Sequence, residues 1–154
     1  MTPDALVFRR AASGDLQAIV ALLADDPIGR SRESPGTPAE GAYRDAFAAI
    51  DRDPNQLLAV AERGGRAIGV LQLTFIPGLT RRGMWRGQIE GVRVAAGERG
   101  SGIGRAMLEW AVAECRKRGC GLVQLTSDKR RAEAHRFYLA RGFQATHEGY
   151  KLVL

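Results

Sequence analysis

The sequence predicts an α/β fold, or α+β in stricter usage, in which helices cover both faces of a mixed sheet. Three observations lead to this prediction. Strand-like apolar runs follow one another in the first half of the chain, amphipathic helix patterns stand beside them, and the last third alternates strand and helix. That late alternation is typical of a right-handed crossover between strands. With 154 residues and 45% hydrophobic content, the chain is expected to form one domain over residues 1–154.

The first strand and the first helix are expected close together near the N-terminus. Residues 6–10 alternate enough to form a strand, and Ser13 offers a cap for the helix that follows. The apolar face of that helix repeats at helical spacing in Leu16, Ile19, Val20 and Leu23. Residues 25–38 then form a long loop, because proline, glycine and serine interrupt every periodicity. Long loops often carry binding functions.

A second helix and a hairpin come next. Thr37-Pro38-Ala39-Glu40 is a capping box with proline at the first helical position, which predicts a helix start. Residues 57–62 and 67–75 are apolar, strand-like runs on either side of Arg63-Gly64-Gly65-Arg66. A short glycine-rich turn between such runs is a strong hairpin signal. Residues 80–83 are expected to form a basic loop.

The second half of the chain carries the crossover. We expect a strand at 88–94, a helix at 101–118, a strand at 122–126, a helix at 132–140 and a closing strand or hairpin at 143–154. The first of these helices is the most regular in the chain, and one of its faces carries Ile103, Met107, Ala111 and Cys115.

The charge of the chain points to phosphates without choosing among their sources. The net charge is +6, and the basic residues stand in short clusters. Nucleic acid, an acidic peptide and a phosphorylated cofactor all remain open on charge alone. The two cysteines and two histidines lack the spacing of a metal site, so no metal is expected. No apolar run reaches the ~20 residues of a membrane span, so we expect a cytoplasmic protein without a membrane partner.

A glycine-rich turn precedes the most regular helix. In Arg99-Gly100-Ser101-Gly102-Ile103-Gly104, side chains are missing just where a helix begins and its free N–H groups point outward. Those groups, the helix dipole and the flanking Arg99 and Arg105 favour a bound pyrophosphate. A P-loop would need lysine at Arg105, and a dinucleotide fingerprint would need a third glycine there. A tight turn with no ligand is the alternative for this hexapeptide taken alone.

The order of three motifs resembles the GNAT superfamily of N-acetyltransferases. They are Gln88-Ile89-Glu90-Gly91-Val92-Arg93-Val94, then Arg99-x-x-Gly102-x-Gly104, then Ala134-His135-Arg136-Phe137-Tyr138 with Gly142-Phe143. The resemblance implies a GNAT-like, mostly antiparallel sheet, acetyl-CoA as the acetyl donor and an amine acceptor. Ser127-Asp128-Lys129-Arg130-Arg131 also resembles small-amine enzymes that act on aminoalkylphosphonates or aminoglycosides, which implies a small-molecule amine.

The resemblance also implies a set of cofactor contacts. The turn would hold the pyrophosphate through its backbone, and the main chain of Val92 and Val94 would meet the acetyl carbonyl and the pantetheine. Gly91 fits a bulge in that strand. Two departures from the family are Gly91, which replaces a larger residue, and Arg131, which replaces asparagine. The implied cofactor residues are Val92, Arg93, Val94, Arg99, Gly100, Ser101, Gly102, Ile103, Gly104, Arg105, Ser127, Ala134 and Phe137.

Glu90 is the candidate general base. An alkyl ammonium loses its proton near pH ~10.4, so transfer at neutral pH needs a base or a desolvated site. Burial in the middle of a strand would make Glu90 a stronger base, with a water relaying the proton. The alternative is an ion pair between Glu90 and Arg93 or Arg86.

Tyr138 matches the family's general acid, which protonates the departing thiolate. Its alternative role is a ring packed in the core beside Phe137. Phe75, Trp85 and Gln88 are predicted walls of the acceptor pocket, and the loop at 25–38 is expected to cover that pocket.

Other functions remain as alternatives to a small-molecule enzyme. They are a peptide or protein amino-terminal acetyltransferase, a CoA-sensing domain without turnover, and a nucleic-acid-binding domain. No recognisable nucleic-acid-reading motif accompanies the basic residues, so nucleic acid is not the expected partner. The sequence leaves a homodimer open and does not identify the acceptor amine.

Overall fold

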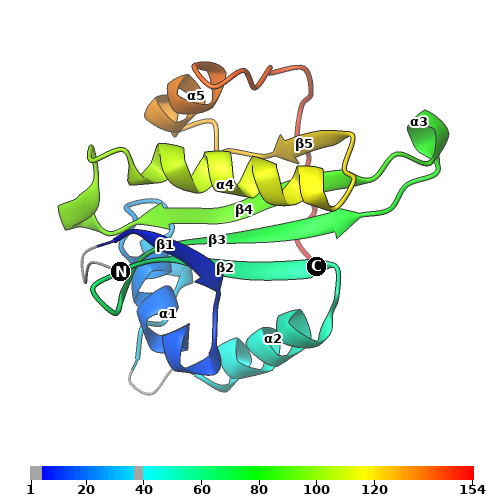
Figure 1. Cartoon of the computed structure of the whole chain (residues 1–154). Coiled ribbons are helices and arrows are strands. Elements are labelled where there is room, and N and C mark those ends of the chain that lie inside the picture. Colours follow the sequence, from blue (N-terminus) through cyan, green and yellow to red (C-terminus); the bar gives the residue numbers. More distant parts are fainter. Residues whose placement is uncertain (1–4, 37–39) are drawn as a thin grey trace. The chain divides into compact units, whose positions relative to one another are not determined.

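Strand order follows chain order in the computed structural model, which describes residues 5–36 and 40–154 (Figure 1). The sheet has the order β1-β2-β3-β4-β5, and the pairings β1–β2, β2–β3 and β3–β4 are antiparallel. The predicted mixed sheet is confirmed. Its strands are β1 (Val7–Arg10), β2 (Gln56–Arg63), β3 (Arg66–Ile76), β4 (Arg86–Val94) and β5 (Leu122–Leu125).

Apart from the short α3, the helices match the predicted order. They are α1 (Leu16–Ala24), α2 (Gly41–Arg52), α3 (Thr80–Gly83), α4 (Ile103–Lys117) and α5 (Ala132–Leu139), with 3₁₀ turns at η1 (Ser13–Asp15), η2 (Arg30–Arg32) and η3 (Ala96–Glu98). The chain divides into two compact units, one ending at Gln124 and the other running over Leu125–Leu154. The first unit holds β1 to β4 and α1 to α4, and the second holds α5.

Helices cover both faces of the sheet in the first unit, as predicted. On one face, Ile19 and Leu22 of α1 pack with Leu58, Val60 and Val70. On the other, α4 lies so close that a Cβ placed at Gly69 would be 2.6 Å from Met107 Sδ. The four residues predicted for the buried face of α4 are each at most 2% exposed, namely Ile103, Met107, Ala111 and Cys115.

Two predicted backbone features are confirmed. Gly64 and Gly65 have φ of 55° and 74°, which a tight hairpin turn between β2 and β3 requires. In β4, Gly91 has φ of 61°. Val70 pairs with Arg93 and Gln72 pairs with Glu90, so between these two pairs β4 has one residue more than β3. An extra residue of that kind is a β-bulge, and positive φ explains why glycine occupies it.

Several sequence predictions differ from the structure. Ser13 does not cap α1, because the chain enters that helix through η1 and no side chain caps it. The predicted basic loop at 80–83 is the single turn α3, in which Arg81 and Arg82 have positive φ. No strand forms at 143–154, where apolar alternation lacks the neighbouring ladder that a strand requires. The capping residues Thr37, Pro38 and Ala39 lie outside the described residues.

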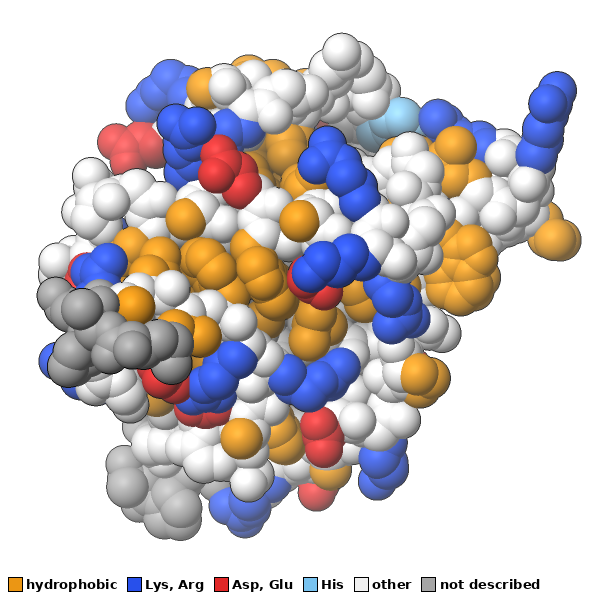
Figure 2. All heavy atoms as spheres, viewed as in Figure 1, with side chains coloured by type: hydrophobic (Ala, Val, Ile, Leu, Met, Phe, Trp, Pro, Cys, Tyr) orange, Lys and Arg blue, Asp and Glu red, His pale blue; other side chains and the backbone are white. Residues whose placement is uncertain are grey.

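The surface agrees with the predicted scatter of charge. Figure 2 shows lysine and arginine side chains in separate groups over the face that it presents. In the described part of the chain, no helix combines the length and the apolar character needed to cross a membrane. Nor do three potential metal-ligating side chains gather within those same residues.

Candidate functional site

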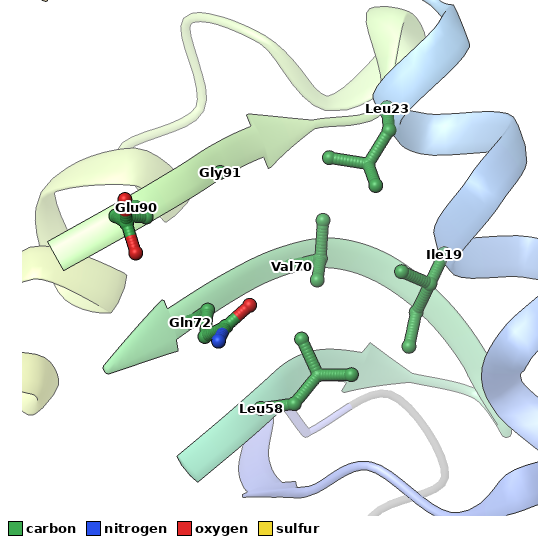
Figure 3. Close-up of a pocket in the computed structure, with 7 residues that line it drawn as sticks. All are labelled: Ile19, Leu23, Leu58, Val70, Gln72, Glu90 and Gly91. Carbon is green, nitrogen blue, oxygen red and sulfur yellow. The ribbon is translucent and has the colours of Figure 1, made fainter. Parts of the chain in front are cut away.

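A pocket of about 260 Å³ opens on the face of the sheet that α1 covers (Figure 3). Helix α1 and strands β2, β3 and β4 all contribute to it. Its wall is mainly apolar, with one amide and one carboxylate, which is the composition typical of small-molecule sites. The lining residues are Ile19, Leu23, Leu58, Val70, Gln72, Glu90 and Gly91.

Glu90 supplies the carboxylate of this pocket. It is the register partner of Gln72, and its neighbour Ile89, which is 2% exposed, points to the opposite face of the sheet. Glu90 is exposed rather than buried, so the desolvation expected from its place in the strand is absent. The bulge at Gly91 follows directly after it in the chain.

The alternative ion pairs of Glu90 do not form. Arg93 Nη2 lies 3.4 Å from Asp26 Oδ2 instead. Arg86 Nη1 donates to Gln124 Oε1 at 3.4 Å. Within residues 5–36 and 40–154, no hydrogen bond or ion pair engages the Glu90 carboxylate, which leaves it available to a ligand.

The main chain beyond the bulge is held by arginines. Arg93 Nη1 donates to the Val92 carbonyl oxygen at 2.8 Å, and Arg99 Nε donates to the Val94 carbonyl oxygen at 3.1 Å. A ligand that pairs with this part of β4 would therefore accept hydrogen bonds from the N–H groups of the strand, or it would displace a guanidinium group from a carbonyl oxygen. This limits how Val92 and Val94 can meet a pantetheine arm.

The glycine turn leads directly into α4. Gly100 and Gly102 have φ of 79° and 85°, and Gly102 is the N-cap of the helix. The helical ladder begins with Ala106 N–H bonding to the Gly102 carbonyl, so the N–H groups of the first turn have no helical acceptor. A Cβ at Gly100 or Gly102 would meet no atom within 4 Å. The turn is thus an open surface with outward N–H groups, which suits an anion.

Both arginines beside the turn already pair with carboxylates. Arg99 Nη2 lies 2.9 Å from the carbonyl oxygen and 3.2 Å from Oδ2 of Asp25. Arg105 Nε lies 2.7 Å from Glu109 Oε1, and this contact raises the pKa of the Arg105 guanidinium, which stays charged. An arriving phosphate would share these arginines with the two acids.

Asp26 joins the loop after α1 to the pocket strand. The side chain of Asp26 is 8% exposed, accepts the Gly29 N–H at 2.5 Å and pairs with Arg93 of β4. The described part of the loop, residues 25–36, does not contribute to the pocket lining. Its expected role as a cover stays a prediction, and Pro38 lies outside the described residues.

The predicted acceptor walls are not part of this pocket's lining. Phe75 is 2% exposed, lies under the Arg118 guanidinium at 4.3 Å and belongs to the face that α4 covers. Trp85 precedes β4 and is 36% exposed. Gln88 shares the face of Glu90 and accepts a hydrogen bond from Gln124 Nε2 at 2.9 Å. None of the three lines the pocket.

Sequence reasoning missed the residues that do line it. The sequence pattern places Ile19 and Leu23 on the apolar face of a helix and Leu58 and Val70 in strands, and gives none of them a role in a site. Gln72 carried a usable signal, since it is a polar residue in an apolar strand. Its place opposite Glu90 depends on the register between β3 and β4, which are joined by a longer connection through α3, so the sequence did not fix that pairing.

The remaining predicted residues lie in the second unit, where Ser127 precedes α5 and Ala134 and Phe137 lie on it. The Tyr138 ring makes edge contacts with Phe137 at 5.3 Å and Phe143 at 5.8 Å between centroids. The ring is half-buried and packs beside Phe137, but no residue of α5 is fully buried, so these contacts do not choose between packing and the acid role, which stays a prediction. His135 Nε2 lies 2.9 Å from the Asp128 carbonyl oxygen, a contact that orders the start of α5.

Comparisons with known proteins agree with these features. A curated aminoalkylphosphonate N-acetyltransferase of Salmonella typhimurium is 38% identical over 106 residues, which span 69% of this chain and 68% of that protein. The structure of a transcriptional regulator from Bacillus halodurans C-125 matches with a TM-score of 0.95 and 46% identity, covering 97% of this chain and all of that one. A Trypanosoma brucei acetyltransferase matches with a TM-score of 0.78 and 28% identity, over 97% and 100% of the two chains.

The family match includes both parts of the candidate site. The sequence model of the acetyltransferase (GNAT) family matches residues 16–143. That range begins with α1, includes the bulged strand with Glu90 and the glycine turn, and ends beyond α5. Because this match and the Salmonella N-acetyltransferase agree, the chain belongs to the GNAT family and is an acetyltransferase.

Proposed function

We propose that the chain transfers an acetyl group from acetyl-CoA to the primary amine of a small molecule by direct attack of the amine on the thioester. The observation that carries this proposal is the unpaired Glu90 carboxylate in an apolar pocket, on the strand that leads to the glycine turn. A base beside a pocket is what an amine needs at neutral pH.

The glycine turn fits the phosphates of coenzyme A. The open space over Gly100 and Gly102 and the free N–H groups of the first turn of α4 would hold the pyrophosphate, with Arg99 and Arg105 adding charge. The predicted contacts of Ser101, Ile103 and Gly104 belong to this group, and those of Val92, Arg93, Val94, Ser127, Ala134 and Phe137 to the pantetheine arm. Acetyl-CoA, when bound, supplies the activated acetyl thioester.

Glu90 would take the proton of the acceptor ammonium, directly or through a water molecule. The apolar side chains of Ile19, Leu23 and Val70 disfavour a charged amine nearby, and this also promotes loss of the proton. An acceptor in the pocket would cover the exposed carboxylate and exclude solvent from it. Tyr138 would then protonate the departing thiolate, and the contacts of its ring with Phe137 and Phe143 would fix the direction of its hydroxyl.

The size of the pocket favours a small acceptor. Its volume of about 260 Å³ lies below the ~300–1,000 Å³ of sites for drug-sized ligands. A peptide terminus would need a longer groove. The name of the Salmonella relative suggests one class of small amine, the aminoalkylphosphonates.

The test is an acceptor screen with the purified chain. Acetyl-CoA is mixed with 2-aminoethylphosphonate, an aminoglycoside, a primary alkylamine and a peptide with a free amino terminus, and thiol release and product mass are measured. We expect acetylation of a small amine and little of the peptide. Acetylation of the peptide alone would favour the amino-terminal alternative, and the absence of any product would contradict the proposal.

Binding to DNA is a second candidate, because the relative from Bacillus halodurans is described as a transcriptional regulator. Against it, many basic side chains here already pair with carboxylates, among them Arg9, Arg63, Arg93, Arg99, Arg105, Lys117, Lys129 and Arg130. Titration of duplex DNA at two salt concentrations distinguishes the candidates, since phosphate binding would weaken steeply with salt.

A further inference from the structure

We infer that Arg86 binds the acidic group of the acceptor, so that the enzyme acts on short zwitterionic amines that carry a phosphonate, phosphate or carboxylate. This rests on the proposed function, because the amine is taken to lie at Glu90. It adds a second charged contact, on the same strand, that decides which amines are accepted.

Arg86 lies on the same face of β4 as Glu90. The register pairs Arg86, Gln88 and Glu90 with Ile76, Thr74 and Gln72 in unbroken steps, because the bulge comes only at Gly91. Alternate residues of a strand point to one face. Gly87, between Arg86 and Gln88, faces Cys115 of α4, where an added Cβ would collide with the sulfur. Arg86, Gln88 and Glu90 therefore point away from α4, to the face on which the pocket opens. Arg86 and Gln88 lie outside the pocket lining, so the acid of the acceptor would extend from the pocket, past Glu90, along this strand.

Polar side chains form a continuous row on this face. Arg86 Nη1 donates to Gln124 Oε1 at 3.4 Å, and Gln124 Nε2 donates to Gln88 Oε1 at 2.9 Å. The adjacent strands add Gln72 Nε2 and Thr74 Oγ1, which both donate to Gln56 Oε1 at 2.9 Å. The row runs from a cation at Arg86, through amides, to the carboxylate of Glu90.

The guanidinium group of Arg86 is not satisfied by the protein. Its Nε atom is buried and has no hydrogen-bond partner among the described residues. Its Nη1 bond is long, and no ion pair of the described chain includes Arg86. A buried donor without an acceptor costs free energy, so such a group needs an explanation. Arg93, near the other end of β4, and Arg99, beyond that end, are instead in ion pairs with Asp26 and Asp25.

An oxyanion provides what this group lacks. Guanidinium binds carboxylates, phosphates and phosphonates through two parallel N–H donors, which a planar fork at Arg86 can offer. The Gln124 and Gln88 amides lie beside it as further polar partners. A neutral alkyl tail would give the Arg86 cation no charged partner and would leave its Nε atom without an acceptor.

The spacing sets the size of the acceptor. Four residue steps separate Arg86 from Glu90, which is about 13 Å between backbone positions at ~3.4 Å per residue. Arg86 contacts Gln124, which in turn bonds to Gln88, the residue between Arg86 and Glu90 on this face. If the two charged groups keep the backbone spacing, a hydrogen bond of ~2.9 Å at each end leaves about 7 Å between the amine nitrogen and the acid. A short carbon chain spans that gap.

The experiment compares acceptors with and without the acid. For the parent, kcat/KM is measured with 2-aminoethylphosphonate and with its uncharged diester, and the first value is divided by the second. The same ratio is then measured for Arg86→Gln and Arg86→Lys. We expect the parent to favour the acid and Arg86→Gln to lower the ratio at least about tenfold, mainly through KM. Arg86→Lys should recover part of it. Arg66→Gln, at an exposed arginine of β3, is the matched control.

Three results would overturn the inference. They are equal use of both acceptors by the parent, an unchanged ratio in Arg86→Gln, and the same loss in Arg66→Gln. The melting temperature of Arg86→Gln distinguishes substrate binding from a structural role. Removal of an unsatisfied buried donor should leave the stability of the fold unchanged or raise it.

Failure of the proposed function would look different. If no amine is acetylated, calorimetry with 2-aminoethylphosphonate alone still decides about Arg86. Tighter binding to the parent than to Arg86→Gln supports the anion site, and equal or absent binding contradicts it.

Discussion

Glu90 faces Gln72 across the ladder and has no ionic partner among the described residues. We therefore predict that Glu90→Gln lowers kcat/KM most near neutral pH, and progressively less as the pH approaches ~10.4, because alkaline solution supplies the neutral amine unaided. Steady-state rates between pH 6.5 and pH 9.5 measure this. Asp51→Asn, at an exposed carboxylate of α2, is the control. A loss that is uniform with pH would point to a positioning role for Glu90.

Tyr138 offers a second prediction for a single residue. Removal of the hydroxyl in Tyr138→Phe should lower kcat by about 10²–10⁴, the range for a lost proton donor, with coenzyme A affinity nearly unchanged. The ring contacts with Phe137 and Phe143 are kept, so the melting temperature should change little. Tyr150→Phe, at a tyrosine that is 91% exposed, is the matched control. Parental activity of Tyr138→Phe would assign leaving-group protonation to water or to the acceptor.

At the scale of the element, the glycine turn and α4 form the proposed pyrophosphate site. Gly102 has φ of 85°, so any side chain there strains the backbone. A substitution at Gly102 would therefore change both the stability of the fold and the affinity for coenzyme A. Gly104 lies inside the first turn of α4 and gives a cleaner test. We predict that Gly104→Val raises the Kd for coenzyme A at least about tenfold, because the side chain crowds the N–H groups that hold the anion.

Calorimetry with coenzyme A measures this effect. Gly97→Val is the matched control, since a Cβ at Gly97 meets no atom within 4 Å and its φ is not positive. A Gly104→Val protein that melts like the parent and binds coenzyme A equally well would mean that the glycines only shape the turn. That result would leave Glu90 and its pocket without a cofactor site nearby.

The elements that sequence patterns placed well are those whose signals are local. The helix at α4 was found from its apolar repeat, the β2–β3 hairpin from its two glycines, and the bulge from Gly91. Apolar periodicity, and the glycines that positive φ favours, are features of short stretches of sequence, so they can be recognised without knowledge of the fold. The predicted strand at 143–154 was wrong because a strand also needs a partner, and alternation alone does not say whether one is present.

At the scale of the whole molecule, stability at low pH provides a further prediction. Arg9 of β1 donates to Asp15 at 2.7 and 2.9 Å and to Glu62 of β2 at 2.7 Å. The Arg9 guanidinium lowers the pKa of Asp15 below its ordinary value of 3.8. As the pH falls, Asp15 is therefore protonated in the unfolded chain before it is protonated in the folded chain. The stabilisation of the fold by the Asp15 carboxylate is complete above pH ~4 and is lost as the pH falls further.

Urea unfolding of Asp15→Asn tests this link. The variant should lose about 1–2 kcal/mol of unfolding free energy at pH 7, the scale of hydrogen bonds to a charged group. The difference between variant and parent should shrink as the pH falls toward 3. Asp51→Asn is again the control. A difference that is constant with pH would contradict the role given to the Asp15 charge.

By itself, the sequence determined the order of the main strands and helices as far as α5, the glycine turn before α4, the bulge at Gly91 and the resemblance to the GNAT superfamily. These depend on spacing along the chain. Only the tertiary structure decided that Glu90 is exposed in a pocket with Gln72, Ile19 and Leu23, and that Arg86 lies in one polar row with Gln88 and Gln124.

The reason is geometric. Phe75, Trp85 and Gln88 are close to Glu90 along the chain or across one strand, which made them natural choices for pocket walls. However, strand alternation turns Phe75 to the α4 side, and α1 fills the space opposite β3 with residues from far earlier in the sequence. A site is made where several elements meet, and the packing of helices on a sheet fixes which side chains meet there.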